Sequence, residues 1–373
     1  MSIADSPLLT LLIPSRERAE TLRHTLRTAL DQDSPSYEVI VSDNLSHDET
    51  PTLLSSFSDT RLQKLRTDRH LSMCDHWEFA LRHAHGKYIV FIGDDDAVLP
   101  RGIERLTELI RRRPSPAYFW KPPVYAWPMD GNPAWIRFIP RPSREVEIPL
   151  RPLIRRVIRY GGWNYAKLPC VYHSAVSRDI LEAIRAKTGR VFHSTQPDIF
   201  TSMAVPAFAA SHVRSARPFT LHGISAKSNG AAAIAQDGTA MVTRFIKEYG
   251  DYPLHPTLYP EIRAFANLVV DAILVAMDLF PDYYRGMRFN YDAMWAFLYK
   301  IGGVGKLEIL RKAREIRRYH RFSIPRFLCY LGLQEGIVRA KQAATRLLSM
   351  HPLSRDLPEN IGEFARAYSR FTD

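Results

Sequence analysis

The first hundred residues alternate short apolar runs with segments in which apolar residues recur at helical spacing. The compact apolar runs predict buried strands, at 8–13, 37–42 and 88–92. The periodic segments predict amphipathic helices, whose apolar positions fall within 22–30, 73–84 and 103–110. Ser72, followed by Asp75 three residues later, has the spacing of a capping box at the start of the second helix. This alternation indicates parallel βαβ units with right-handed crossovers.

Polar side chains follow each of these predicted strands, at 14–17, 43–44 and 94–96. In open α/β sheets, ligands bind beyond the carboxyl ends of the strands. We therefore expect the three polar clusters to meet at one edge of the sheet and to form a binding site there.

The pattern changes after residue 113. A stretch rich in Pro and Trp, 114–152, favours loops and edge strands over helices. Helical spacing returns further along, at 150–160, at 178–187 and after Pro197. Residues 218–230 predict a strand followed by a loop of Gly, Ser and Asn. Beyond residue 236 the pattern is mostly helical.

The composition is that of an ordinary globular protein, with 46 % hydrophobic and 24 % charged residues among 373. Disordered, collagen-like and disulfide-scaffold classes are excluded. The three cysteines lie far apart without a CxxC pair, which favours a reducing compartment and excludes a cysteine zinc site. We see neither a signal peptide nor a spanning segment, so a cytoplasmic protein is expected.

The formal net charge is +12, which favours an anionic partner. Much of the excess lies between residues 300 and 347, where twelve Lys or Arg face three Asp or Glu. A basic amphipathic helix can lie on the inner face of an anionic membrane, or it can pack on the protein with its charges in solvent. Both interpretations stay open.

The triplet Asp94, Asp95 and Asp96 follows the apolar run YIVFI. Adjacent carboxylates repel one another, and Mg²⁺ or Mn²⁺ among their oxygens would relieve that repulsion. The alternative is a solvated acidic turn. Asp43 ends the second strand, where it can accept hydrogen bonds from a nucleobase or a ribose, or else cap a turn.

These residues resemble a known family. The segments IPSRERAETLRHTLRTAL, VIVSDNLSHDET and YIVFIGDDDAVLP resemble the three ordered motifs in the nucleotide-binding half of family 2 glycosyltransferases, which have the GT-A fold and an inverting mechanism. The family often has an acid where Gly93 stands. The resemblance implies metal binding by Asp95 and Asp96. It also implies that three places bind the donor. These are the first loop, with Pro14, Ser15 and Arg16, the end of the second strand, with Asp43, and the first acid of the triplet, Asp94.

The resemblance extends more weakly to later segments. Asp198 stands at the start of a predicted helix, where family members place their catalytic base, although it could also simply cap the helix. His222 and Lys227 lie in the segment HGISAKSNG, which resembles a loop that closes over the donor; the alternative is a flexible connector. His173 and His193 read as packed or surface histidines, and no histidine pair has metal-site spacing.

The fold class expected is α/β: a GT-A, Rossmann-like domain with a mixed sheet, followed by a mainly helical module. The expected boundaries are 1–113 for the nucleotide-binding half, 114–235 for the acceptor half and 236–373 for the basic helical module. The expected activity is transfer from a nucleotide-diphosphate sugar, UDP rather than GDP or dTDP, to a glycan, a lipid-linked acceptor or a protein, in bacterial surface glycan synthesis. A sugar-phosphate nucleotidyltransferase and a basic protein that binds membranes or nucleic acid are the alternatives; a nucleic-acid partner is not expected.

Overall fold

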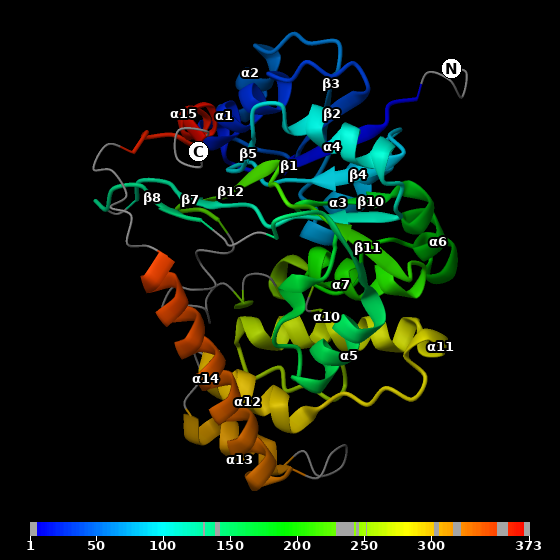
Figure 1. Ribbon diagram of the computed structural model, residues 1–373, viewed down its shortest axis with the longest axis vertical. Coiled ribbons are helices and arrows are strands. Elements are labelled where there is room, and N and C mark those ends of the chain that lie inside the picture. Colours follow the sequence, from blue (N-terminus) through cyan, green and yellow to red (C-terminus); the bar gives the residue numbers. More distant parts are fainter. Residues whose placement is uncertain are drawn as a thin grey trace.

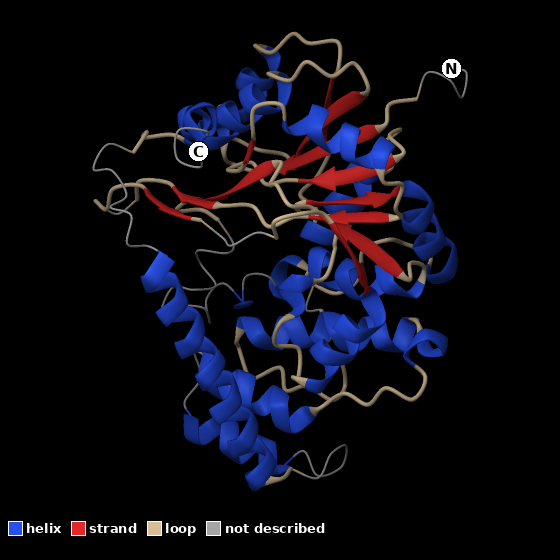
Figure 2. Ribbon diagram, viewed as in Figure 1, coloured by secondary structure: helices blue, strands red, loops and turns tan. Residues whose placement is uncertain are grey.

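The computed structural model describes residues 6–129, 131–138, 142–228, 242–243, 246–250, 252–301, 306–315, 322–348 and 357–368. Figures 1 and 2 show an α/β layer built around two sheets and, on one side of it, a group of helices from the second half of the chain.

The larger sheet has eight strands in the order β3-β2-β1-β4-β10-β6-β11-β9. The strands β1, β2, β3 and β4 pair in parallel, and β10 then pairs antiparallel with β4 and β6, so the sheet is mixed. The bounds are β1 Leu9–Ser15, β2 Tyr37–Asp43, β3 Leu62–Arg66, β4 Tyr88–Phe91, β6 Ala117–Phe119, β9 Val146–Pro149, β10 Ser174–Ser177 and β11 Ser211–Arg214.

The sheet separates two hydrophobic cores because successive side chains of a strand point to opposite faces. In β1, Leu9, Leu11 and Ile13 face one core, whereas Leu12 faces the other. The first core contains residues from α1 Ala19–Leu30, α2 Thr50–Ser55 and α4 Gly102–Arg112. The second contains residues from α3 Met73–Leu81, α5 Leu150–Arg159, α6 Arg178–Thr188 and α7 Pro197–Ala204.

A smaller sheet of four strands, in the order β5-β12-β7-β8, lies beside the carboxyl edge of the larger one (Figure 1). Its strands are β5 Ala97–Val98, β7 Val124–Ala126, β8 Trp135–Arg137 and β12 Thr220–Ile224. The last described helix, α15 Ile361–Ala367, packs here: Ile361, Phe364 and Ala365 share a core with Tyr125 and Leu221. The end of the chain thus returns to the first half.

The remaining helices lie below the sheet in Figure 1. They are α10 Phe265–Leu279, α11 Pro281–Tyr284, α12 Tyr291–Ile301, α13 Lys306–Glu315 and α14 Ile324–Leu348. The helix α10 packs against α7 within the second core. In the described part of the chain, none of the helices combines the length and apolarity that a membrane span requires.

The three strands and the mixed α/β class expected from the sequence are confirmed. Ser72 caps α3, because its hydroxyl accepts a hydrogen bond from the Asp75 N–H. The 114–152 segment holds short strands, as expected, until α5 begins. The sequence analysis missed the strands β3, β5, β10 and β11 and the six-residue helix α2. These elements are too short or too polar to show a period.

Candidate active site

The three polar clusters meet at the carboxyl edge of the large sheet, as the sequence predicts. The parallel register of β1 and β2 sets Ser15 beside Asp43. The Ser15 hydroxyl donates to Asp94 Oδ2 over 2.7 Å, which joins the end of β1 to the segment after β4. All three residues of the acidic triplet are buried, Asp96 completely.

Arg18, just ahead of α1, is the cation that partners the first two acids of the triplet. Its Nη1 lies 3.4 Å from Asp94 Oδ1 and 3.2 Å from Asp95 Oδ2. Ser225 completes the arrangement, since its hydroxyl donates to Asp95 Oδ2 over 2.6 Å and also lies 3.2 Å from Arg18 Nη1. Asp95 therefore faces Arg18 and Ser225. The sequence analysis did not single out Arg18, because nothing in the segment distinguishes it from Arg16.

Asp96 points the other way, into a group of aromatic and imidazole rings. Its Oδ2 accepts from the Tyr172 hydroxyl at 2.7 Å and lies 3.1 Å from His173 Nε2. Its Oδ1 accepts from the Gly223 N–H at 2.7 Å and lies 3.4 Å from His222 Nδ1.

Two glycines let the backbone approach the triplet. A Cβ on Gly223 would stand 1.7 Å from the Asp95 carbonyl oxygen, so only glycine fits at this point of β12. A Cβ on Gly93 would stand 3.0 Å from Asp95 Oδ1 and 3.1 Å from Asp96 Oδ2. An acidic side chain in place of Gly93 would crowd the two carboxylates, which explains the departure from the family pattern.

The side-chain atoms of Asp96, His173 and His222 all lie within 4.8 Å of one another and could hold a metal ion. His173 Nδ1 lies 2.7 Å from Thr220 Oγ1, and this hydrogen bond orients its Nε2 toward Asp96. His173 is packed, as the sequence suggests, and it also belongs to this candidate metal group. It stands 49 residues from His222 in the sequence, so no local spacing could reveal the pair.

Burial and charge give the three acids different pKa values. Burial raises the pKa of Asp94, although Arg18 and the Ser15 hydroxyl oppose it. Burial and the adjacent Asp96 raise the pKa of Asp95 to about 6. Burial would also raise the pKa of Asp96, but His173 and His222 hold it well below the usual range.

The two histidines shift in opposite directions. Burial lowers the pKa of His173, so this ring is neutral at pH 7 and offers hydrogen bonds more than charge. Burial lowers the pKa of His222 as well, but its hydrogen bond and attraction to Asp96 outweigh that effect and raise it. His222 is therefore more easily protonated than His173.

Asp43 is 1 % exposed and already bonded on both oxygens. Its Oδ1 accepts from the Ser46 N–H at 2.9 Å, and its Oδ2 pairs with Arg66 at the end of β3. The turn-capping role considered from the sequence is therefore present, and Arg66 holds the side chain at the sheet edge.

The other predicted donor-binding residues lie at the rim. The half-exposed Arg16 guanidinium contacts His70 and lies 3.2 Å from Glu248 Oε1. Lys227 donates to the Glu17 carbonyl oxygen over 2.9 Å, and the Lys227 carbonyl oxygen accepts from Arg18, so the two loops are tied across the acids. Pro14 lies within β1, next to Ser15.

Asp198 is in the first turn of α7, where the sequence placed it. Burial raises its pKa, although the backbone N–H groups of Ile199 and of Asp198 itself lower it. A helix N-terminus favours an ionised carboxylate, but at Asp198 burial has the larger effect on the pKa. Asp198 is close enough to raise the pKa of Tyr172, the residue that donates to Asp96.

The loop ahead of α7 is fastened by α10. Ser194, which has a positive φ of 66°, donates to Asp271 Oδ2 over 2.6 Å, and the His255 N–H donates to Asp271 Oδ1 over 2.7 Å. Asp271 is completely buried. A residue of the C-terminal helices thus helps to place the segment that carries Asp198.

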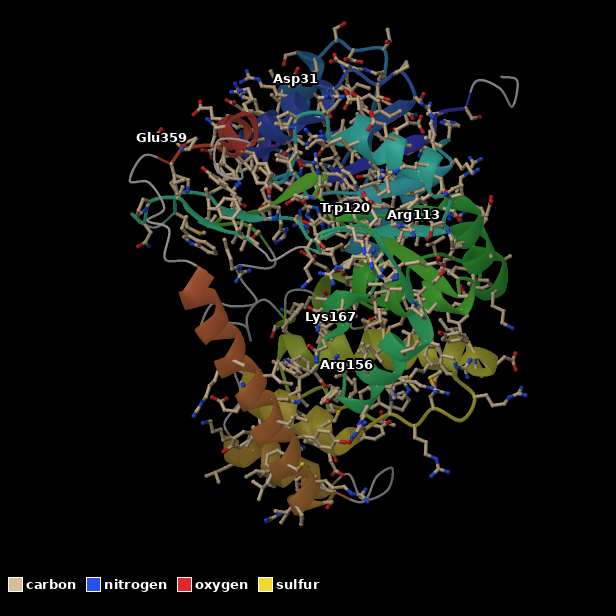
Figure 3. All side chains as sticks on the ribbon, in the orientation of Figure 1. Asp31, Arg113, Trp120, Arg156, Lys167 and Glu359 are labelled. Carbon is tan, nitrogen blue, oxygen red and sulfur yellow. The ribbon has the colours of Figure 1, made fainter. Side chains whose placement is uncertain are left out.

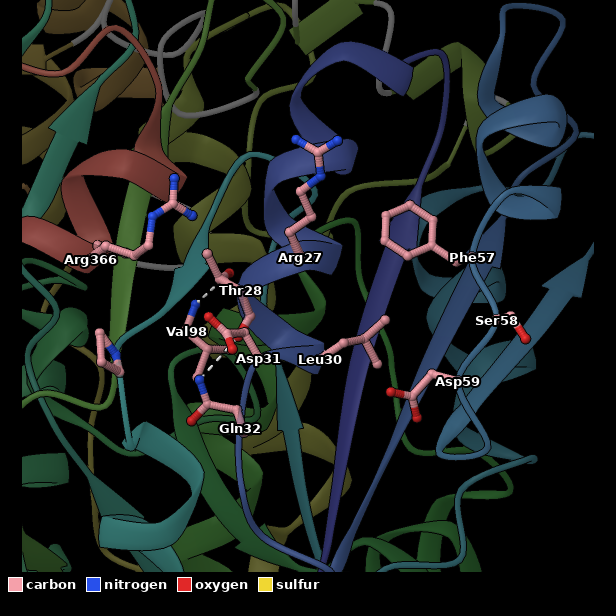
Figure 4. A pocket seen from close by; sticks show the side chains of 12 residues that line it. Arg27, Thr28, Leu30, Asp31, Gln32, Phe57, Ser58, Asp59, Val98 and Arg366 are labelled. Carbon is pink, nitrogen blue, oxygen red and sulfur yellow. Dashed lines mark hydrogen bonds between the residues drawn. The ribbon is translucent and has the colours of Figure 1, made fainter.

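A separate cavity of about 360 Å³ lies away from the acids, between the far end of α1, the turn after α2 and α15. Figure 4 shows Arg27 and Arg366 beside it, with Asp31 and Asp59. Because α1 has twelve residues, its two ends are about 18 Å apart, and Arg18 is at the opposite end from this cavity. Chemistry at the triplet does not use it.

Comparison with known proteins finds a match over the segment that carries the triplet. Residues 10–181, which include β1, β2, β4 and the triplet, match the family model described as glycosyl transferase family 2. This segment, a little under half of the chain, is similar to glycosyltransferase family 2.

Curated proteins that are similar to the first part of this chain are named for bacterial glycan synthesis. ExoO of Rhizobium meliloti, a succinoglycan biosynthesis protein, is 28 % identical over 102 residues, which are 27 % of this chain and 29 % of that protein. The Escherichia coli protein WfgD, named a UDP-Glc:alpha-D-GlcNAc-diphosphoundecaprenol beta-1,3-glucosyltransferase, is 27 % identical over 100 residues, 27 % of this chain and 40 % of WfgD. The match thus spans less than half the length of these relatives.

A solved structure supports the fold over most of the chain. The crystal structure of TarS residues 1–349 from S. aureus, in complex with UDP-GlcNAc, superposes with a TM-score of 0.51 at 15 % identity. The superposition covers 85 % of this chain and 94 % of that one. The fold is of the GT-A type, with a mixed sheet and a helical C-terminal region.

Proposed function

We propose that this protein is an inverting glycosyltransferase that moves a sugar from a nucleotide-diphosphate donor, UDP rather than GDP or dTDP, to an acceptor hydroxyl. The observation that carries the proposal is the buried triplet at the sheet edge, flanked by Arg18 and by His222. Cations arranged around a carboxylate cluster can receive the charge that develops on a departing diphosphate. The family match and the UDP-glucose donor named for WfgD support the same activity.

The donor would lie on the carboxyl edge of β1, β2 and β4. Asp43 would face the base, the Ser15–Asp94 pair the ribose, and Arg16, Lys227 and His222 the diphosphate. We assign residues 1–113 to donor binding, 114–235 to the acceptor side and 236–373 to the helical support. Asp271 illustrates that support, because it reaches from α10 to the loop before α7.

A divalent cation fits the residues present. The donor set joins one carboxylate, Asp96, to two imidazoles. We add Asp95 as a further oxygen ligand through Oδ1, which lies beside Gly93 like Asp96 Oδ2. Carboxylate oxygens suit Mg²⁺ and Mn²⁺, and the imidazoles favour Mn²⁺ of the two. When bound, the ion would neutralise charge on the diphosphate.

Asp198 would act as the general base. Its raised pKa lies closer to neutrality than that of an ordinary aspartate, which suits a group that takes a proton during the reaction. The acceptor oxygen would attack the anomeric carbon from the face opposite the diphosphate. As that bond forms, the bond from the sugar to the diphosphate breaks, the proton passes to Asp198, and the nucleoside diphosphate leaves.

The acceptor class follows from the relatives. WfgD is named for a diphosphoundecaprenol-linked acceptor, and ExoO for succinoglycan synthesis. We propose a glycan or lipid-linked acceptor in bacterial surface glycan synthesis, rather than a protein, with the enzyme at the inner face of the membrane. The nucleotidyltransferase alternative lacks a glycine-rich loop after β1, where the chain reads IPSRER.

The deciding experiment measures hydrolysis and transfer with a panel of UDP-, GDP- and dTDP-sugars, with Mn²⁺, with Mg²⁺ and with EDTA. We expect turnover of at least one UDP-sugar with Mn²⁺. The proposal fails if no nucleotide sugar is turned over or stabilises the protein, or if the enzyme instead forms a nucleotide sugar from a sugar phosphate and a nucleoside triphosphate.

A further inference from the structure

The helix α5 has one buried face and one densely basic face. Its sequence, LRPLIRRVIR, contains no acid. The buried positions are Leu150, Ile154, Val157 and Ile158, and they face the second core. The exposed positions carry four arginines, which we call the arginine face: Arg151, Arg155, Arg156 and Arg159. Figure 3 labels Arg156, on the helical side of the molecule.

In the described residues, none of these four guanidinium groups has a carboxylate within ion-pair distance. Arg151 and Arg156 instead lie over the rings of Tyr283 and Tyr160, at 5.7 and 5.8 Å. The segment 300–347, for which the sequence left membrane contact open, differs in part. There Arg311 pairs with Glu308 and Glu315, and Glu335 pairs with both Lys300 and Arg339.

The arginine face weakens the helix that carries it. Arg151, Arg155 and Arg159 follow one another at intervals of four, and like charges at that spacing repel. Arg151 also lies in the first turn, where the helix dipole disfavours a cation. Arg156 and Arg159 lie in the last turn, where the dipole favours a cation, but helix stability does not account for Arg151 and Arg155. An anionic partner outside the protein would account for all four.

The helix α14 touches the end of α5. The ring of Tyr160, at the end of α5, packs edge-to-face against that of Tyr330 in α14, with centroids 6.2 Å apart. The first turns of α14 expose Ile324 by 48 % and Leu328 by 56 %, and helical spacing turns both away from the side of Tyr330. Exposed arginines suit the headgroup region of an anionic bilayer, where the charges meet phosphates. The lipid-linked acceptor proposed above favours a bilayer over a nucleic acid as the anionic partner.

We propose that the arginine face docks the protein on a bilayer of anionic phospholipids. The attraction is electrostatic, so binding is reversible and salt-dependent. The proposal rests on the proposed membrane location and not on which reaction the acidic site carries out. It deepens that location by placing the contact on α5.

The test is sedimentation of the full chain with vesicles of phosphatidylcholine alone or mixed with phosphatidylglycerol, at low salt and at about 0.5 M NaCl, where the Debye length falls well below 8 Å. Arg151→Gln, Arg155→Gln and Arg159→Gln are combined in one variant. The matched control combines Arg23→Gln, Arg27→Gln and Arg111→Gln, which removes the same charge from exposed positions of α1 and α4. Figure 1 shows those helices on the far side of the sheet from α5.

We expect the wild type and the control to bind the anionic vesicles and to release them at high salt. The α5 variant should lose about 100-fold in affinity, as expected when three arginines leave the surface. Thermal melting and UDP-sugar hydrolysis, measured without vesicles, should stay unchanged in all variants. Hydrolysis thereby tests the proposed enzyme separately from the docking.

Other outcomes overturn the docking. Equal losses in the α5 variant and the control would mean that net charge alone matters. Equal binding to neutral vesicles would remove the role of the arginines. Tighter binding of an RNA oligonucleotide than of anionic vesicles, lost in the same α5 variant, would assign the face to nucleic acid. If the triple variant unfolds, Arg155→Gln with Arg159→Gln repeats the test, because neither side chain lies over an aromatic ring in the described structure.

Discussion

The acidic triplet and the arginine face are both clusters of like charge, but they differ in burial and in charged partners. Asp94, Asp95 and Asp96 are buried, and each has found partners: Arg18 for the first two, Tyr172 and two histidines for the third. The arginines of α5 are exposed and have no acidic partner in the described structure. Burial makes an unpaired charge costly, whereas water tolerates one at the surface.

This difference indicates whether each cluster suits catalysis or surface binding. The partners of the buried acids already sit where a diphosphate and a cation would bind, so that site is organised before substrate arrives. The exposed arginines are hydrated and unpaired, so they remain available to an anionic surface. Changing a buried charge should therefore have large effects on chemistry, and changing an exposed one should have small effects.

The largest effect is expected for Asp96→Asn. The substitution keeps the shape but removes the charge that faces His173 and His222, so transfer should fall about 10³-fold. Steady-state turnover of the preferred UDP-sugar measures this. The control is Asp68→Asn, the same change at an exposed position after β3, and its transfer rate should be close to that of the wild type. Near-normal transfer by Asp96→Asn would show that the triplet is structural only.

Asp198→Asn comes next, with a fall of about 10² in kcat. The amide can still accept from the helix N–H groups but cannot take a proton, so donor KM should change little. Glu182→Gln, on the exposed side of α6, is the control. A fall with Glu182→Gln and none with Asp198→Asn would move the base to α6.

Removal of a histidine ligand should weaken Mn²⁺ binding about 10-fold or more. His173→Gln and His222→Gln are each compared with His47→Gln, which changes an exposed histidine. Thermal melting with UDP, at rising Mn²⁺, gives the affinity. UDP should stabilise the wild type only when the metal is present, because the triplet repels a bare diphosphate. An equal rise of the melting temperature with UDP in excess EDTA would argue against a role for any metal in donor binding.

Mn²⁺ affinity should also fall on acidification through pH 6. The Asp95 carboxyl has a pKa of about 6, and the pKa of His222 is raised, so both take up protons in the range where Asp96 stays ionised. A proton then competes with the metal, and affinity rises with pH until both groups are deprotonated. Titration calorimetry between pH 5 and about 8 measures it. A flat profile would exclude Asp95 and His222 as ligands.

The smallest of these effects is expected for Asp43→Asn. Both of its oxygens are already bonded inside the protein, so loss of charge should raise the donor KM only about 5- to 10-fold, the size of one hydrogen bond. Turnover at saturating donor should survive. A loss of kcat with unchanged KM would contradict the assignment of Asp43 to the nucleotide.

Local patterns in the sequence were enough for the first half of the fold. Apolar runs of strand length and helical spacing are set by neighbouring residues, and they located β1, β2 and β4 with the helices α1 and α3. The parallel order then predicted that Ser15, Asp43 and Asp94 would meet. Short or polar elements such as α2 and β3 left no periodic signal, because only tertiary contacts hold them in place.

What the sequence by itself determined is therefore the α/β class, the sheet edge that gathers the polar clusters, and the acids at that edge. Only the tertiary structure decided which groups surround those acids. Arg18 precedes the triplet by 76 residues, counting to Asp94, and Gly223 follows Asp96 by 127. Their approach depends on the packing of β12 against the sheet edge, and the pKa values depend on the burial that results. Charge and spacing along a chain record local preferences, whereas burial is a property of the whole fold.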